Sequence, residues 1–357
     1  LGRRDDGDVR SLDPSGLIVR PHHDTRYFDN QGFLASDGCP MKVLRSLTLA
    51  MAIGAGLMPL TSQAWWSGDY KHRTKVTLNT TAQGVETKEA LSGAVVPVRL
   101  HSGNFDFLGA KTDGSDIRVV AADDKSPLKF WVERFDSTNE LAVLWVQVPS
   151  IAPGTDKNHV FVYAGNEKAA AEANQAAIFD GAMLAAISMS GKDAEAVDAS
   201  GQIKSTSAIS REANGLIGAA AKLDGQQGIT WSSDKLKASA SGPYSVSLWV
   251  KPEAAAGQLL KQGPLVVGLD AGSLAASLGS LKAVGGDLPV NAWAHVAITV
   301  GTSKLTLYVN GAQAAQADLA ANSAAIEGPL VVGEGFKGLV DELEVAATVR
   351  SADWIKL

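Results

Sequence analysis

Residues 291–313 read NAWAHVAITVGTSKLTLYVNGAQ, and this stretch has the pattern of two short β-strands in succession. Ala294–Val300 and Lys304–Val309 are rich in β-branched and apolar residues, which are enriched in strands. Asn310-Gly311 follows the second strand directly and is a dipeptide that favours a tight hairpin turn. The stretch therefore predicts antiparallel β-structure.

The same pattern extends outward from this stretch in both directions. Apolar runs of strand length alternate with clusters of Asp, Gly, Pro, Ser and Asn, as expected for an antiparallel sandwich. The strands expected here are 73–78, 95–100, 117–121, 130–135, 141–148, 159–163, 244–250, 265–268 and 339–345. The predicted fold class is all-β, with two antiparallel, jelly-roll-like β-sandwich domains.

Two segments are predicted to be helical. Glu167 to Ala177 reads EKAAAEANQAA, a composition that favours a short helix. We place a linker at residues 167–178, between a first domain at 65–166 and a second at 179–357. Ser351 precedes Ala-Asp-Trp-Ile and predicts the N-cap of a helix.

The N-terminal residues have the layout of an export signal. Residues 1–40 show no sustained periodicity, and we interpret them as a leader upstream of the true start at Met41 or as a disordered leader. Residues 41–64 then have a basic beginning, an uncharged stretch and small residues before the predicted cleavage site between Ala64 and Trp65. We expect a periplasmic or secreted protein.

Composition excludes several classes of function. The chain has 357 residues, of which 45% are hydrophobic, 20% charged and 6% aromatic, and a formal charge of −6. These are ordinary globular proportions, and the chain has no dense basic stripe of the kind that binds nucleic acid. A single cysteine excludes a disulfide framework and a thiolate metal site.

The second domain resembles a known family. The segments that carry the resemblance are YSVSLWVKP (244–252), residues 291–313 and GFKGLVDELEVAATVRSADWI (335–355). Residues 230–355 are similar to the laminin-G-like, concanavalin A-type domains of bacterial exported proteins. The resemblance implies a jelly-roll fold and names no ligand.

The first domain resembles an exported domain of unknown function. The similar segments include WWSGDYKHRTKVTL (65–78), VPVRLHSGNFDF (96–107) and VFVYAGN (160–166). The pair of domains is similar to the periplasmic front part of MotA/TolQ/ExbB-type proton channel proteins, in which three membrane helices follow. Two alternatives stay open: a fragment that ends before such helices, or a stand-alone exported relative.

An acidic cluster near the C-terminus has two interpretations. Glu342 and Glu344 share one face of the predicted strand because side chains alternate. Laminarinase-type hydrolases of similar architecture use two carboxylates on alternate residues, as acid and nucleophile. Leu343 stands where such enzymes have a further acid, so we interpret the cluster as structural and predict no catalytic residue.

Metal and cofactor sites have little support in the sequence. Asp113-Gly-Ser-Asp116 supplies oxygen donors, so Asp113 and Asp116 are weak candidates for calcium ligands, although the same residues favour a turn. The histidines show no metal-binding spacing, and His295 is expected to pack beside Trp293. We predict no cofactor other than this weak calcium candidate.

Seven of the eight tryptophans divide into two groups. Trp131, Trp145, Trp249 and Trp293 fall at predicted strands and are expected in the cores. Trp65, Trp66 and Trp231 are the predicted ligand-contact aromatics, because exposed indoles stack on sugar rings and anchor interfaces.

The sequence therefore predicts a non-catalytic exported protein that binds or senses an envelope glycan or protein. By resemblance, it is part of, or a companion to, an inner-membrane ExbB/TolQ/MotA-type proton channel. The alternative is a secreted carbohydrate-binding or adhesive module. A glycoside hydrolase is a third hypothesis.

Overall fold

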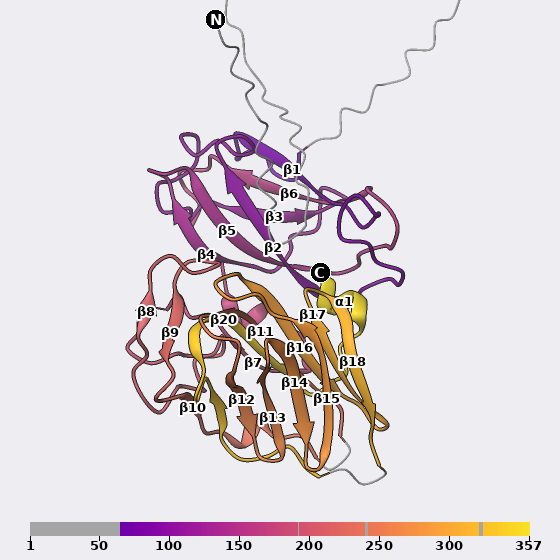
Figure 1. Cartoon of the computed structure of the whole chain (residues 1–357). Helices are drawn as coiled ribbons and strands as arrows, with labels where there is room; N and C mark the ends of the chain where they lie inside the picture. The colour runs from indigo at the N-terminus through magenta and orange to yellow at the C-terminus, as the bar shows by residue number, and fades with distance from the viewer. Residues whose placement is uncertain (1–64, 192, 240–241, 321–323) are drawn as a thin grey trace, which may run out of the picture.

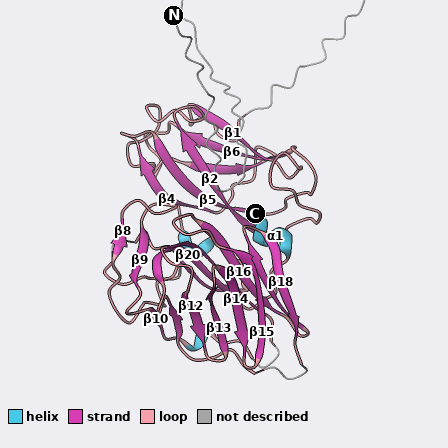
Figure 2. Cartoon of the chain, viewed as in Figure 1, coloured by secondary structure: helices cyan, strands magenta, loops and turns pink. Residues whose placement is uncertain are grey.

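A computed structural model of the chain describes residues 65–191, 193–239, 242–320 and 324–357. The predictions for the leader at 1–40 and the signal peptide at 41–64 lie outside the described residues. Strands dominate what is described (Figure 2), which confirms the all-β class. In the described ranges, no helix is both long enough and apolar enough to cross a bilayer.

The first domain is a sandwich of two three-stranded antiparallel sheets. One sheet has the order β1 (His72–Leu78), β6 (Asn158–Ala164), β3 (Arg118–Ala121), and the other has the order β2 (Ala94–His101), β5 (Leu141–Val148), β4 (Phe130–Asp136). Alternate apolar residues of both sheets meet in one core, which includes Val76 and Val160 from one sheet and Val96 and Leu144 from the other.

The second domain packs a six-stranded sheet against a larger one. The six-stranded sheet has the order β10 (Ile229–Trp231), β19 (Leu330–Val332), β12 (Gly257–Gln262), β13 (Leu265–Asp270), β14 (Ser273–Leu278), β15 (Leu281–Asp287). The larger sheet has the order β18 (Ala312–Asp318), β17 (Lys304–Val309), β16 (Ala294–Val300), β11 (Tyr244–Pro252), β20 (Lys337–Ala346), β9 (Ala220–Asp224), β8 (Arg211–Glu212), with β7 (Met183–Ile187) also paired to β20. One large core fills the space between them.

The stretch at 291–313 forms the predicted strands β16 and β17 and turns into β18. Asn310 and Gly311 both have positive φ, of 49° and 75°, which a two-residue turn of this kind requires. The Asn310 side chain accepts a hydrogen bond from the His295 backbone N–H at 2.9 Å. The turn residue thus also holds the start of β16.

The predicted helical linker is wrong. Residues 167–174 form no helix, and the only regular element of this segment is the 3₁₀ turn η1 (Gln175–Ala177); a second 3₁₀ turn, η2 (Asp234–Leu236), lies in the second domain. Arg118 holds the segment on the first domain by donating to the Ala170 carbonyl at 2.5 Å and pairing with Glu172 at 2.9 Å. Carbonyls held by side chains of the sandwich cannot take part in a helical ladder, so tertiary contacts override the alanine propensity.

The C-terminal helix α1 (Ala352–Lys356) joins the two domains. Ser351 is its N-cap, as predicted, and accepts a hydrogen bond from the Trp354 N–H at 3.2 Å. The helix lies at the junction (Figure 1), where Trp354 and Leu357 pack against the core of the first domain. The buried Asp353 carboxylate accepts hydrogen bonds from the backbone N–H groups of Lys88 and Glu89, at 2.6 and 2.9 Å.

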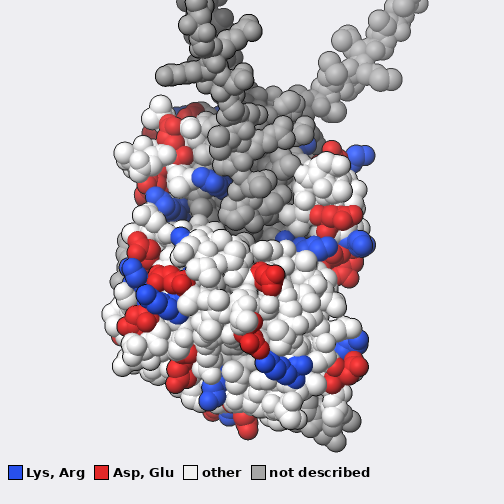
Figure 3. Space-filling view, in the orientation of Figure 1, with Lys and Arg blue, Asp and Glu red and all other residues white. Residues whose placement is uncertain are grey.

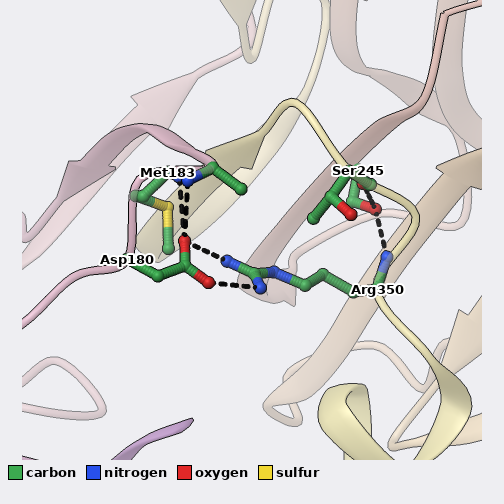
Figure 4. A network of polar contacts seen from close by, with 6 residues as sticks. Asp180, Met183, Ser245 and Arg350 are labelled. Carbon is green, nitrogen blue, oxygen red and sulfur yellow. Dashed lines mark hydrogen bonds and ion pairs between the residues drawn. The ribbon is translucent and has the colours of Figure 1, made fainter. Parts of the chain in front are cut away.

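A second polar network fixes the segment that enters α1. Figure 4 shows the Arg350 guanidinium paired with both oxygens of Asp180, at 2.7 and 3.0 Å. The Arg350 backbone N–H donates to the Ser245 hydroxyl at 2.9 Å, and the Arg350 guanidinium also stacks on Trp354 at 4.0 Å. The residues just after the linker, strand β11 and the start of α1 are therefore held together.

We predict that Asp353→Ala lowers the free energy of unfolding by about 1.5–3 kcal/mol, because two backbone N–H groups lose a charged acceptor. Urea denaturation measures this change. Asp234→Ala is the matched control, since Asp234 is exposed and forms a surface ion pair with Lys237. An Asp353→Ala curve that overlies the wild-type curve would show that the helix does not couple the domains.

Candidate functional site

The main candidate site is a pocket of about 600 Å³ between the two domains. Sheet β2-β5-β4 forms one wall with Pro97, Val143 and Trp145, and the outer face of β11, β16 and β20 forms the other. The C-terminal helix contributes Trp354 and neighbouring residues. A pocket of this size suits a small organic ligand.

Glu133 reaches the junction from an irregularity in strand β4. The pairing of β4 with β5 shifts between Val132 and Arg134, so Glu133 is an extra residue in a β-bulge. Bulges re-aim side chains and occur often beside functional sites. The Trp145 indole N–H donates to Glu133 Oε2 at 2.5 Å, and the Ser188 hydroxyl donates to Oε1 at 2.8 Å.

Glu342 lies at a second bulge, in the facing domain. The pairing of β20 with β11 shifts between Ser247 and Trp249, and Glu342 has a φ of +47°. A left-handed backbone at a residue with a side chain costs about 1–3 kcal/mol and occurs preferentially at functional sites. Glu342 Oε1 is also buried and has no hydrogen-bond partner in the described part of the chain. Strain and an unpaired oxygen coincide in one residue.

The predicted shared face of Glu342 and Glu344 is confirmed, because both line the main pocket. Both also line a small adjoining cavity of about 10 Å³, with Trp131 and Ser188 in its wall. The intervening Leu343 points into the core of the second domain. Glu344 is half-buried at the junction.

Burial and mutual repulsion raise the pKa values of this carboxyl cluster. Burial is the larger cause at Asp341, whose pKa rises to about 7, and the charge of Glu133 adds to it. Burial, and then the charges of Glu133, Asp341 and Glu344, raise the pKa of Glu342 well above its ordinary value. Burial likewise raises the pKa values of Glu133 and Glu344. The cluster therefore holds protons that ordinary carboxyls lose.

Aromatic rings lie beside the carboxyl cluster in the second domain. Asp341, Trp249 and His295 are directly paired across β20, β11 and β16 and share one face of the sheet. The Trp249 and His295 rings are in contact, with centroids 5.2 Å apart, so His295 packs on Trp249 rather than on Trp293 as predicted. Burial lowers the pKa of His295 to about 4, which leaves the ring neutral at pH 7.

Basic side chains lie elsewhere in the pocket wall. Arg350 and Lys356 come from the C-terminal segment, and Arg99 and Arg134 come from the first domain. Arg134 is paired with Asp136 at 3.2 Å, and Arg350 is engaged by Asp180. The pocket therefore has an acidic region, a basic region and aromatic walls.

The prediction that four tryptophans lie in the cores is wrong. Trp145, Trp249 and Trp293 line the main pocket, and Trp131 lines the small cavity beside it. The sequence carried a signal for this arrangement: Leu144-Trp145 and Leu248-Trp249 place large apolar residues on both faces of a strand. Strands that are apolar on both faces are covered on both faces.

The calcium candidates serve as structural acceptors. Asp116 is fully buried and accepts backbone N–H groups of Lys111 at 3.0 Å and Gly165 at 2.6 Å, which connects two loops. Asp113 accepts the Ser115 N–H at 3.0 Å, as expected in an Asx turn. No three His, Cys, Asp or Glu side chains of the described ranges are arranged to hold a metal ion. The calcium hypothesis has no support in this geometry.

The predicted ligand-contact aromatics have different positions. Trp231 is 0% exposed and its indole donates to the Ala196 carbonyl at 3.0 Å, so its proposed ligand contact is wrong. Trp65 and Trp66 are half-buried and pack edge-on against Tyr163, at centroid distances of 5.8 and 5.7 Å. Their role in ligand contact stays a prediction.

Figure 3 shows acidic and basic side chains interspersed on the visible face, with no large basic patch there.

Family comparisons support both resemblances at the level of the domain. Residues 223–356 match the family described as "Concanavalin A-like lectin/glucanases superfamily". Residues 113–181 match a "Domain of unknown function" family, DUF2341. No curated protein matches the chain. These findings include no link to a proton channel.

Solved structures with partial likeness come from several kinds of protein. The binding domain of Paraclostridial Mosquitocidal Protein 1 is 14% identical, with a TM-score of 0.41 over 49% of this chain and 51% of that one. The binding domain of botulinum neurotoxin serotype D is 15% identical, with a TM-score of 0.39 over 49% and 50%. This chain thus spans about half the length of these two proteins.

A third structure is domain 4 of AbnA, an extracellular arabinanase from Geobacillus stearothermophilus, in complex with arabinotriose. It is 25% identical, with a TM-score of 0.38 over 49% of this chain and 96% of that one. The TM-scores of all three structures are too low to support an argument about function.

We predict that Glu342→Gln becomes increasingly stabilising, relative to wild type, as the pH rises from 5 to 8. The folded chain raises the pKa of this carboxyl, so ionisation at higher pH favours the unfolded state. Each unit of pKa elevation corresponds to about 1.4 kcal/mol of stability lost above the folded pKa. Urea denaturation of both proteins across this pH range measures the difference.

The exposed Glu327 provides the control for that series, and Glu327→Gln should follow the wild-type pH profile throughout. A Glu342→Gln variant whose stability difference from wild type does not change with pH would mean that Glu342 is not held neutral by the fold.

Proposed function

We propose that this chain is a non-catalytic binding module whose ligand is a saccharide bound in the pocket between the two domains. The observation that carries the proposal is the pocket itself, which brings Trp145, Trp249 and Trp293 together with the carboxyl groups of Glu342 and Glu344. Indole faces pack against the apolar faces of sugar rings, and carboxyl and amide groups hydrogen-bond to sugar hydroxyls.

The match of residues 223–356 to a lectin and glucanase superfamily supports the same proposal. One fold serves many functions, so the evidence for a binding role comes from the residues of the pocket. Here the site needs both domains: Trp145 and Arg134 come from the first, and Trp249 and Glu342 come from the second. Neither domain alone would enclose the ligand.

We predict that a glycan array probed with the protein identifies a saccharide whose affinity falls about tenfold in Trp249→Ala and in Trp145→Ala. Loss of one ring contact of ~1.4 kcal/mol gives this change. Titration calorimetry measures the affinities. Trp66→Ala is the control, because Trp66 packs on Tyr163 in the first domain and does not line the pocket. The proposed site is contradicted if all three variants weaken saccharide binding equally, or if neither pocket variant weakens it.

Incubation of the protein with the saccharide that the array identifies tests the glycoside hydrolase alternative. The position of Glu342 and Glu344 in the pocket wall favours this alternative. A hydrolase uses one protonated and one ionised carboxyl at the bond that breaks. We expect the saccharide to be recovered intact by chromatography. Cleavage products that disappear with Glu342→Gln would replace the binding proposal with an enzymatic one.

We further propose that the protein acts in the bacterial envelope, as the periplasmic part of, or a companion to, an ExbB/TolQ/MotA-type proton channel. The signal-like residues 41–64 and the resemblance of the domain pair support this proposal. The described residues would contribute ligand recognition, since proton transfer across a bilayer takes place within membrane-spanning segments.

We predict that the full chain, produced in a bacterium with two membranes and released by osmotic shock, is periplasmic and begins at Trp65. Mass spectrometry of the released protein identifies its N-terminus. Cross-linking before lysis should join it to a subunit of a proton channel. Cytoplasmic protein that retains residues 41–64 would contradict export, and cross-links to unrelated proteins alone would contradict the channel proposal.

A further inference from the structure

The acidic region of the pocket has an electrostatic property that indicates the charge of its ligand. Glu342 and Glu344 of the second domain line the pocket there, and Glu133 of the first domain and the buried Asp341 lie behind them, close enough for their charges to act on Glu342. The charges of Glu133, Asp341 and Glu344 all disfavour ionisation of Glu342. None of the four forms an ion pair with a lysine or arginine of the described ranges. The potential at this end of the pocket is therefore negative whenever these groups ionise.

Three of these carboxyls have visible protein partners or a nearby cation. Glu133 accepts from Trp145 and Ser188, and Asp341 accepts the backbone N–H groups of Ile217 at 3.3 Å and Glu342 at 3.1 Å. The charge of Arg350 favours ionisation of Glu344, although Asp180 holds the Arg350 guanidinium.

Glu342 differs in one of its two oxygens, although its side chain also interacts with Ser188 and Glu133. Its Oε1 atom is buried, has no hydrogen-bond partner within the described residues, and belongs to a side chain that lines the pocket. Its backbone is held in a left-handed conformation that a strand residue would ordinarily avoid. Buried oxygens are ordinarily hydrogen-bonded, so an unpaired one on a side chain that lines a pocket indicates an acceptor for a ligand.

We propose that the saccharide bound in this pocket is an amino sugar, whose ammonium group lies at the Glu342 and Glu344 end beside Trp249. This inference rests on the proposed saccharide-binding function and adds the charge of the ligand. An ammonium donates hydrogen bonds to carboxylates and supplies the positive charge that offsets their repulsion. The indole of Trp249 adds a favourable cation–π contact.

An organic cation fits the site better than a metal ion. The pocket has a volume of about 600 Å³ and walls of Trp145, Trp249 and Trp293, which suit a ligand with an apolar body. The described residues include no group of three side chains arranged to hold a metal. His295 next to Trp249 is neutral and does not repel an ammonium, and the charge of Arg350 in the same pocket wall is offset by its pairing with Asp180.

Binding of the ammonium group is expected to release protons. A cation beside the cluster favours the ionised form of Glu342 and its neighbours, and thus lowers their pKa values. Protons held by the free protein then leave when the ligand binds. A neutral saccharide makes no such change, because it favours neither the carboxyl nor the carboxylate by charge.

The test compares three trisaccharide probes by titration calorimetry at pH 5.5: the trimers of glucosamine, N-acetylglucosamine and glucose. Each titration is performed in two buffers of different ionisation enthalpy, which reports the number of protons exchanged. We expect the glucosamine trimer to bind at least about tenfold more tightly than the other two, equivalent to ~1.4 kcal/mol, with net proton release.

Variants identify the residues responsible. Glu342→Gln, and separately Glu344→Gln, should reduce the preference for glucosamine over N-acetylglucosamine to near one, whereas Glu327→Gln should retain it. Two independent substitutions guard against a folding defect in either, and circular dichroism checks the fold of each.

Equal affinity for the charged and neutral trimers would overturn this inference and leave the saccharide-binding function standing. The inference also fails on its own if the glycan array identifies a neutral ligand and the glucosamine trimer does not bind. If neither the array nor the three trimers show binding, the proposed function fails together with the inference.

Discussion

Repulsion between carboxyl groups at the junction of the two domains is the constraint around which the rest of the site is organised. Glu133 and Glu342 belong to different sandwiches, and each lies at a bulge that breaks the pairing of its strand. In a regular strand, Glu133 and Glu342 would each pair with one residue of the neighbouring strand, and their side chains would alternate with those of the core residues. The two bulges instead bring carboxyl groups together in a half-buried place, where burial and mutual repulsion oppose their ionisation.

Contacts elsewhere hold this unfavourable arrangement in place. The Asp353 carboxylate binds two backbone N–H groups of the first domain, and Trp354 packs on that domain's core. Arg350 and Asp180 fix the segment that leads into the helix. A short helix at the end of the second domain thus keeps the two sheets facing one another. The walls of the pocket are opposed because of this attachment.

Much of the fold could be predicted from the amino-acid sequence, but less of the candidate site could be. The Asn310-Gly311 turn and the Ser351 cap act through local chemistry, so their positions followed directly from the sequence. The Ala-rich segment at 167–178 did not, because Arg118 is distant in sequence and holds the segment's carbonyls.

The strand alternation that placed Glu342 and Glu344 on one face was sound. The bulges at Glu133 and Glu342 depend on pairing partners that no local pattern specifies. The pairs Leu144-Trp145 and Leu248-Trp249 did indicate strands that are covered on both faces. This signal was missed when both residues of each pair were assigned to the core.

A double-mutant cycle between Glu133 and Glu342 tests most directly whether the two domains share one carboxyl cluster. The free energy of unfolding is measured at pH 8 for wild type, Glu133→Gln, Glu342→Gln and the double variant. If the two carboxyls repel one another across the junction, the stabilisation in the double variant will be smaller than the sum for the single variants, because each substitution alone already removes the repulsion. Additive effects, within the ~0.5 kcal/mol expected of independent sites, would mean that the two carboxyls do not interact and that the cluster does not exist as described.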